Sequence, residues 1–239
     1  MKTIARQVNA SETAFIFPSK KADFKIRWFT PNTEVGLCVH ASLASLAVLK
    51  KERHVKKSDL SLETKNGLLK ASLGKKIFIS VSGYQRQSQK IKIALLKKYL
   101  KINNGDLDDQ PRIIKIFQDK ELLVPVKKLS KLKNLKPNQK NYAALCRALR
   151  VTGISIFTQQ TFNKSNTLHT REFAPLYGYL EDPLCGLAAG AIAFYLQKPS
   201  LRIEQGNFLN LPGVIEVVSK SKTTYFIGGQ TKIFKTLTL

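Results

Sequence analysis

The sequence predicts a protein of two related halves, each combining β-strands with one central helix. Residues 27–49 and 171–196 share one plan: Arg, any residue, Phe, a small residue, Pro, a turn, a Cys, and then a helix rich in Ala, Ser and Gly. Aligning Cys38 with Cys185 also aligns Ala41 with Ala188 and Ala44 with Ala191. The second copy has the longer turn before its Cys, which is typical of an old duplication followed by a loop insertion.

The start of each predicted helix is a candidate anion-binding site. In each copy an extended segment ends at Pro and the helix opens just after the Cys, near Val39-His40 and near Gly186-Leu187. A helix N-terminus carries unpaired backbone N–H groups and a partial positive charge, so it binds carboxylates and phosphates. Two such helix ends facing one cleft would suit a small anionic ligand.

The first half is expected to span residues 1–104. We predict helices at 3–8, 41–51 and 88–100, and strands at 13–17, 24–29, 60–64, 67–72 and 75–82. Asn66-Gly67 is a strong hairpin signal between two of these strands. The run Asn103-Asn104-Gly105-Asp106 ends the last helix, and the predicted boundary lies there.

The second half is expected to span residues 105–239. We predict strands at 112–117, 121–126 and 151–158, helices at 130–135 and 138–149, a polar loop at 163–167, and then the second repeat. Short strands separated by Pro and Gly turns follow at 202–205, 213–219, 223–227 and 231–236. Cys146, on an amphipathic helix, is predicted to lie in the core.

The net charge of +24, from 40 Lys and Arg against 16 Asp and Glu, sets this chain apart from an ordinary metabolic enzyme. A basic surface attracts anions and binds nucleic acid through phosphate contacts. The lysines, however, alternate with Leu and Val at helical spacing rather than with stacking aromatic residues, and no nucleic-acid-binding motif is present. A solvated basic face is therefore favoured over nucleic-acid binding, which stays the less favoured alternative.

Composition also bounds the location and the cofactors. No apolar run is long enough to span a membrane, and the first residues do not form a signal peptide, so we expect a cytoplasmic protein. Three cysteines do not make a disulfide framework and fit a reducing compartment. The scattered His residues and the lack of a Gly-rich phosphate loop predict neither a metal site nor a nucleotide cofactor.

Five groups of residues, in this order, resemble motifs of the phenazine-biosynthesis PhzF-like family. They are Ser11-Glu12-Thr13-Ala14-Phe15, Arg27-Trp28-Phe29-Thr30-Pro31, Glu34, Cys38-Val39-His40-Ala41-Ser42-Leu43-Ala44, and Glu181-Asp182-Pro183. The resemblance implies an α+β fold like that of diaminopimelate epimerase. In that fold two pseudo-symmetric halves, each a mostly antiparallel sheet or barrel around a central helix, enclose the active site in the cleft between them. It also implies that the last strand returns to the first half and that the protein forms a homodimer.

The resemblance further implies a cofactor-independent isomerase or epimerase that moves a proton between carbons of a small carboxylic acid. Glu12 matches the position of the family's principal acid/base, and His40 and Asp182 match its assisting residues. Taken alone, these residues have ordinary alternatives: Glu12 could cap the turn after Ser11, His40 could be a structural hydrogen-bonding residue, and Asp182 could be a turn residue or N-cap.

Two positions depart from the family pattern where the substrate carboxylate is expected to bind, at Val39-Ala41 and Gly186-Leu187. Val39 stands where the family has Gly; its side chain takes up space and disfavours a positive φ. Leu187 stands where the family commonly has Ser, so a hydroxyl donor is lost. Family members usually start earlier, with a strand that the given sequence does not contain. Either the start of the sequence is truncated or misassigned, or the first half lacks this strand, which would expose a sheet edge. These departures predict a changed substrate or lost catalysis, and in the second case a basic binding or scaffold protein.

A further departure suggests a different mechanism. Cys185 replaces the family's usual Thr, so that both repeats carry a Cys before the helix, as in the related proline racemases and diaminopimelate epimerases. In those enzymes paired thiols work from opposite faces of a carbon, and a helix N-terminus favours the thiolate. The alternative is therefore a two-thiol racemase using Cys38 and Cys185. The presence of Glu12 in its motif favours the PhzF-like interpretation.

Overall fold

The computed structural model describes residues 1–178 and 180–233 and divides into two compact units, Met1–Val81 with the chain from Phe226 onward, and Ser82–Tyr225. The sequence placed the boundary at residue 104, after the Lys-rich helix. In the structure, that helix lies in the second unit, because Leu96, Leu100 and Ile102 belong to the hydrophobic core of that unit. The turn at residues 103–106, which suggested the boundary, lies between that helix and the next strand of the same unit.

The first unit is a mixed sheet with the strand order β1-β2-β4-β5-β6, and β3 pairs with β2. The strands are β1 (Thr13–Phe17), β2 (Phe24–Phe29), β3 (Glu34–Val35), β4 (Asp59–Thr64), β5 (Gly67–Leu73) and β6 (Ile77–Ser82). The pairing is antiparallel except between β2 and β4, which run parallel. The parallel pair requires a crossover, and helix α2 (Val39–Lys51) lies in it.

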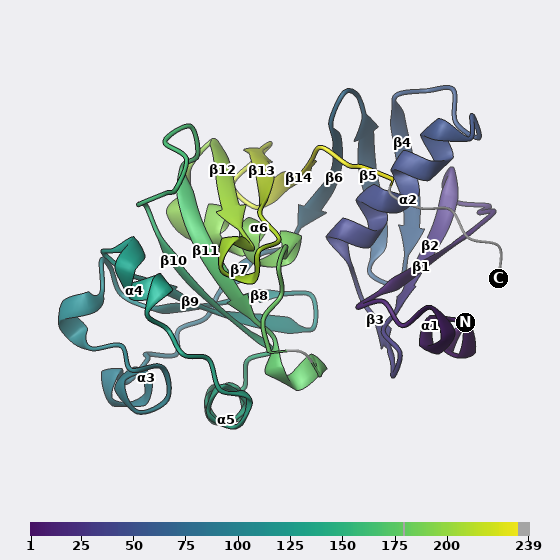
Figure 1. The fold of residues 1–239 in the computed structure, drawn as a ribbon. Helices are drawn as coiled ribbons and strands as arrows, with labels where there is room; N and C mark the ends of the chain where they lie inside the picture. Colours follow the sequence, from purple (N-terminus) through teal and green to yellow (C-terminus); the bar gives the residue numbers. More distant parts are fainter. Residues whose placement is uncertain (179, 234–239) are drawn as a thin grey trace. The chain divides into compact units, whose positions relative to one another are not determined.

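Alternating burial explains why these segments are strands. Along β4 and β5 the residues that face the core, such as Leu60, Leu62, Leu69 and Ala71, alternate with more exposed ones. The predicted hairpin is confirmed, with Gly67 at φ 106° in the turn. Helix α2 packs against β1 and β5 (Figure 1), while α1 (Lys2–Val8) buries only Ala5.

The second unit is built on a sheet with the order β13-β12-β11-β10-β9-β8-β7. Its strands are β7 (Gln85–Arg86), β8 (Arg112–Ile116), β9 (Asp119–Pro125), β10 (Gly153–Thr158), β11 (Leu168–Phe173), β12 (Ser200–Gln205) and β13 (Gly213–Ser219). The β9–β10 and β11–β12 pairs are parallel and the others antiparallel. Strand β14 (Thr224–Gly229) begins in this unit and ends in the first.

Helices cover both faces of the second sheet. On one face, α3 (Ile93–Leu100), α4 (Leu129–Lys133) and α5 (Gln139–Leu149) pack on a core that includes Leu122, Val124, Ile154 and Ile156 (Figure 1). Helix α6 (Gly186–Leu196) packs on β8, β9, β12 and β13 and is buried almost all round. This burial explains the small residues of α6, because the helix backbone can approach the surrounding strands closely only where the side chains between them are small. Three 3-10 turns complete the unit: η1 (Asn104–Asp106), η2 (Pro175–Tyr177) and η3 (Asn207–Leu209).

Most predicted elements are present, with shifts at their ends. The Lys-rich helix begins at Ile93 rather than 88, and the short strands β3 and β7 were not predicted. The predicted strand at 231–236 is not seen over 231–233, and residues 234–236 lie outside the described part of the chain. The expectation that this strand returns to the first half is therefore untested there. None of the helices in the described residues is long and apolar enough to cross a membrane.

Candidate active site

Glu12 and His40 meet in the first unit, where the end of one loop faces the first turn of α2. Glu12 directly precedes β1, and its Oε2 lies 3.1 Å from Nε2 of His40. The Glu12 side chain is 8% exposed and that of His40 37%, so the pair is accessible from the His40 side. The structure thus brings together two of the three residues that the sequence assigned to proton transfer.

Cys38 completes this cluster. Its Sγ lies 3.7 Å from Nδ1 and 3.5 Å from Nε2 of His40, within the hydrogen-bonding range of sulfur from both ring nitrogens. Burial opposes protonation of His40, but the neighbouring Cys38 and Glu12 favour the imidazolium, and the result raises the pKa of His40 to about 11. Burial raises the pKa of Cys38.

The start of α2 provides the backbone groups of the expected anion site. Cys38 is the N-cap, with φ −132°, and Val39 and Ala41 occupy the first turn, both buried. Val39 does not have a positive φ, so the backbone strain expected of Val at this position does not arise. Its side chain still fills space that Gly would leave open, and steric exclusion is the remaining consequence of this departure.

The second set of candidate residues lies at the start of α6 in the second unit. Cys185 is the N-cap of α6, and Gly186 and Leu187 open its first turn. Asp182 lies just before the helix, where its Oδ1 accepts a hydrogen bond from Leu184 N at 2.9 Å and its own N–H donates to the Glu172 carbonyl at 2.9 Å. Asp182 is therefore also a turn residue, which was the ordinary alternative for it.

Cys185 lies in an acidic environment. Burial, together with the carboxyl groups of Asp182, Glu172 and Glu121, raises the pKa of the Cys185 thiol well above its ordinary value. The Ala188 amide opposes this shift, as the Ala41 amide does for Cys38. The helix N-terminus thus acts on both thiols, but burial and neighbouring carboxylates outweigh it.

The two repeats share an ion pair that the sequence analysis did not single out. Arg27 donates to both Glu34 oxygens, at 2.8 Å and 2.7 Å, and Arg171 donates to both Glu181 oxygens, at 2.8 Å and 2.6 Å. Each arginine also lies over the Phe two residues later, at 5.1 Å for Phe29 and 5.3 Å for Phe173. Each Glu precedes its repeat's Cys by the same number of residues, a signal that was present in the sequence.

A pair of carboxyl groups in the second unit was also missed. Glu121 on β9 and Glu172 on β11 both lie beside the Ser155 hydroxyl on β10. The available signal was a glutamate in each of β9 and β11 and a serine in β10, the strand between them. The pairing of β10 with both neighbours, which brings them together, is visible only in the folded sheet.

Comparison with known proteins identifies the family. The family model described as "Phenazine biosynthesis-like protein" (PhzC-PhzF) matches residues 1–236. The chain belongs to the PhzC-PhzF family. Among its relatives, the uncharacterized isomerase YfhB of Bacillus subtilis is 30% identical over 91% of this chain and 79% of YfhB. The human phenazine biosynthesis-like domain-containing protein is 31% identical over 80% of this chain and 70% of the human protein.

Solved structures agree with the family assignment at the level of the fold. A PhzF-family protein of Bacillus anthracis superposes with a TM-score of 0.86 at 24% identity, covering 96% of this chain and 85% of that one. A hydroxyproline epimerase from Agrobacterium vitis superposes with a TM-score of 0.58 at 14% identity, covering 92% and 71%. The PhzC-PhzF chain described here thus has the mixed α/β fold of PhzF-family and epimerase structures.

The cluster in the first unit also has the chemistry of a metal site. Within residues 1–178 and 180–233, Glu12, Cys38 and His40 are the one group of at least three such side chains whose donor atoms all lie within 4.8 Å of one another. Carboxylate, thiolate and imidazole are donors that suit zinc. No metal site was predicted from the sequence, because the three His are scattered and no two Cys lie close together along the chain.

Proposed function

We propose that this PhzC-PhzF protein is a cofactor-independent isomerase or epimerase acting on a small carboxylic acid, with Glu12 as the acid/base. The observation that carries the proposal is the 3.1 Å contact between Glu12 and His40 beside the first turn of α2. The family assignment and the relatives named as isomerases support it.

In the proposed reaction, Glu12 begins as a carboxylate, which the His40 imidazolium at 3.1 Å favours. One Glu12 oxygen takes a proton from a substrate carbon, so a C–H bond breaks and an O–H bond forms. The electron pair stays on the substrate and is delocalised towards its carboxylate or a conjugated double bond. Glu12 then returns the proton to a carbon, which restores the carboxylate.

The backbone N–H groups of the first turn of α2, at Val39 and Ala41, would bind the substrate carboxylate. Gly186 and Leu187 are proposed to do the same from the start of α6, with Asp182 assisting proton transfer. A shared site in a cleft between the halves stays a prediction, as do the homodimer and the cytoplasmic location.

The two-thiol alternative is less well supported. A racemase of that type needs one thiolate, and burial raises the pKa of both Cys38 and Cys185. The carboxyl groups around Cys185 act in the same direction. Exchange chemistry through Glu12 does not require either thiol to ionise.

The test is proton NMR in deuterium oxide with a panel of small cyclic and amino carboxylic acids. The wild-type protein should replace a carbon-bound proton of at least one acid with deuterium. Glu12→Gln should abolish this exchange, because the amide cannot accept the proton, and should leave the circular dichroism spectrum unchanged. Glu52→Gln, at the other end of α2, is the matched control and should exchange normally. Exchange by Glu12→Gln at the wild-type rate would remove Glu12 from the mechanism.

His40 has a separate test because it is proposed to assist rather than to react. His40→Gln should slow exchange without abolishing it, by about 10²–10⁴-fold as is typical of a lost acid/base partner. Its remaining exchange should depend on pH differently from the wild type, since the charge beside Glu12 is gone. An unchanged rate and pH profile would make His40 a structural residue.

A further inference from the structure

The positive charge of the chain is not neutralised by its own acidic residues. The chain has 40 Lys and Arg against 16 Asp and Glu, and many of the acidic groups are already paired internally. Examples are Glu34 with Arg27, Glu63 with Lys25, Asp23 with Lys57, Asp106 with Lys131, and Glu181 with Arg171. Other acidic groups, such as Glu121 and Glu172, lie against each other inside the second sheet. The remaining exposed lysines therefore produce an uncompensated field.

Three helices of the second unit, α3, α4 and α5, carry basic residues and no acidic ones. Residues 64–105 and 122–171 contain no Asp or Glu, and they supply α3, α4 and α5. We call the exposed basic residues on and next to these helices the basic cap: Lys97, Lys98, Lys133, Lys136, Lys140 and Arg147. The apolar sides of the same helices face the core, so the cap residues are not needed for packing.

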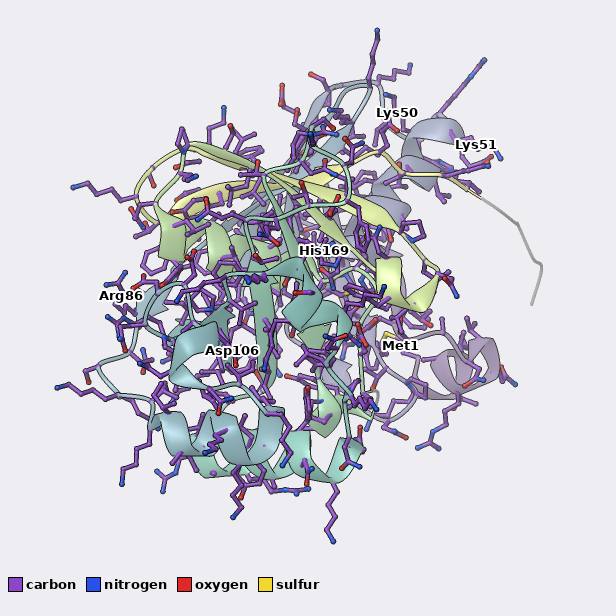
Figure 2. All side chains as sticks on the ribbon, turned by 60° about the vertical axis from the view of Figure 1, so that its left-hand side comes forward. Met1, Lys50, Lys51, Arg86, Asp106 and His169 are labelled. Carbon is purple, nitrogen blue, oxygen red and sulfur yellow. The ribbon has the colours of Figure 1, made fainter. Side chains whose placement is uncertain are left out.

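The three helices form one continuous surface. Residues of α3, α4 and α5, including Leu96, Leu132 and Leu145, share a single hydrophobic core. The Lys131 side chain of α4 donates to the Lys101 carbonyl at the end of α3, at 2.7 Å. The helices lie together on one side of the unit in Figure 1, and long side chains ending in nitrogen project outward from them in Figure 2.

The composition of the basic cap argues against two kinds of polyanionic partner, a membrane surface and a single-stranded nucleic acid. Docking on a membrane uses apolar side chains that enter the lipid beside the basic ones. None of the exposed large hydrophobic residues of the described chain lies on α3, α4 or α5, and the one at Leu176 lies on η2, which packs against α5. Single-stranded nucleic acid is held by stacking on exposed aromatic rings. The aromatic residue on the outer part of α3, Tyr99, is half-buried beneath Lys98.

A surface with many cations and neither apolar nor stacking groups fits a regular array of phosphates. We propose that the basic cap binds the phosphate backbone of a double-stranded nucleic acid, without reading its sequence. This inference does not depend on the proposed isomerase chemistry, because the cap and the Glu12-His40 pair lie in different units. It revises the preference for a purely solvated basic face by adding the partner that this surface fits.

Binding of this kind has a characteristic salt dependence. Each phosphate neutralised by a lysine releases condensed counterions, so the logarithm of the binding constant falls with the logarithm of salt concentration with a slope of about −0.9 per phosphate contact. Removing cap lysines should therefore lower both the affinity and this slope. If binding came instead from charge spread evenly over the chain, the loss of affinity would depend only on the number of lysines removed and not on their position.

The experiment compares two variants of equal net charge. The cap variant carries Lys97→Gln, Lys133→Gln, Lys136→Gln and Lys140→Gln. The control carries Lys20→Gln, Lys51→Gln, Lys56→Gln and Lys75→Gln, all at exposed positions of the first unit. Fluorescence anisotropy with a labelled RNA duplex and a labelled DNA duplex is recorded between about 50 and about 200 mM salt.

The wild type and the control should bind duplex with the same salt slope. The cap variant should bind at least about tenfold more weakly, with its slope reduced by about one for each lysine that contacts a phosphate. Equal losses in both variants, or no binding by the wild type across the salt range, would overturn the proposal. Vesicles of phosphatidylserine and phosphatidylcholine are the third probe, and binding to them in preference to either duplex would assign the cap to a membrane instead.

Discussion

Glu121 and Glu172 lie on opposite sides of one hydroxyl group, that of Ser155, which contacts a carboxyl oxygen of each. A serine hydroxyl has one hydrogen and can donate it to one carboxylate only. The second contact therefore requires a proton on one of the carboxyl groups. Burial is the main cause that raises the pKa of both, to about 8 for Glu121. The negative charges of Asp119 and Asp182 add to the shift of Glu121, and that of Glu121 adds to the shift of Glu172.

This shared proton predicts how stability depends on pH. The folded protein keeps a proton that an unfolded glutamate with a pKa of 4.5 would release, so stability should fall as pH rises from 4.5 to about 8. The slope from this one proton is at most about 1.4 kcal/mol per pH unit. Glu121→Gln supplies a neutral side chain of the same shape that can donate to Glu172, so the variant should lose this part of the slope. Urea unfolding at several pH values measures it.

His40 acts in the same direction at higher pH, because its pKa is also raised by folding. The wild type and Glu121→Gln share the contribution of His40. It therefore cancels when the free energy of unfolding of one protein is subtracted from that of the other at each pH. Parallel stability curves for the two proteins from pH 4.5 to pH 8 would contradict a shared proton at Glu121.

Gly153 makes room for the carboxyl pair. A Cβ on this residue would overlap Glu121 Oε2 and would lie 2.7 Å from Glu172 Oε1. Gly153→Ala should therefore push the carboxyl groups away from Ser155 and destabilise the protein by about 1–3 kcal/mol. Glu121→Ala vacates part of this space, so the double variant should lose less stability than the two single losses added together. Additive losses in denaturant unfolding would show that the two sites are not coupled.

The repeated Arg–Glu pairs should differ in their contribution to stability. The side chains of Arg171 and Glu181 are 6% and 8% exposed, whereas those of Arg27 and Glu34 are 33% and 24% exposed. Glu181→Gln leaves a buried guanidinium without its counter-charge and should cost about 3–5 kcal/mol. Glu34→Gln removes the same group from a pair that water screens, and its cost in the same unfolding experiment should be much smaller. Similar losses at both sites would mean that burial does not set the difference.

The cysteines should react slowly in the folded protein. Burial is the main cause that raises the pKa of all three thiols, to about 12 for Cys146, so little thiolate is present near neutral pH. A chromogenic disulfide reagent should label them at a measurable rate only after unfolding. Cys185→Ser should keep proton exchange near the wild-type rate. Rapid labelling of native Cys185, or loss of exchange in Cys185→Ser, would favour the two-thiol mechanism.

Local patterns in the sequence were sufficient to predict much of the secondary structure. Strands β2, β4, β5 and β13 were predicted from local patterns, and the Asn66-Gly67 turn was placed correctly, because these features depend on residues close together in the chain. The unit boundary was misplaced because a Gly turn looks the same within a unit as between two. Which core the Leu face of α3 joins is decided by distant residues such as Leu122 and Leu145.

The same division applies to the candidate site. The sequence alone determined the duplicated plan, the two cysteines at the helix starts, the family, and the residues Glu12, His40 and Asp182 as candidates, since motifs are local or keep their order along the chain. Only the tertiary structure decided that Glu12 reaches His40 and that Glu121 and Glu172 share a hydroxyl. Those contacts join residues on different elements, and strand pairing and helix packing bring them within hydrogen-bonding distance only in the folded chain.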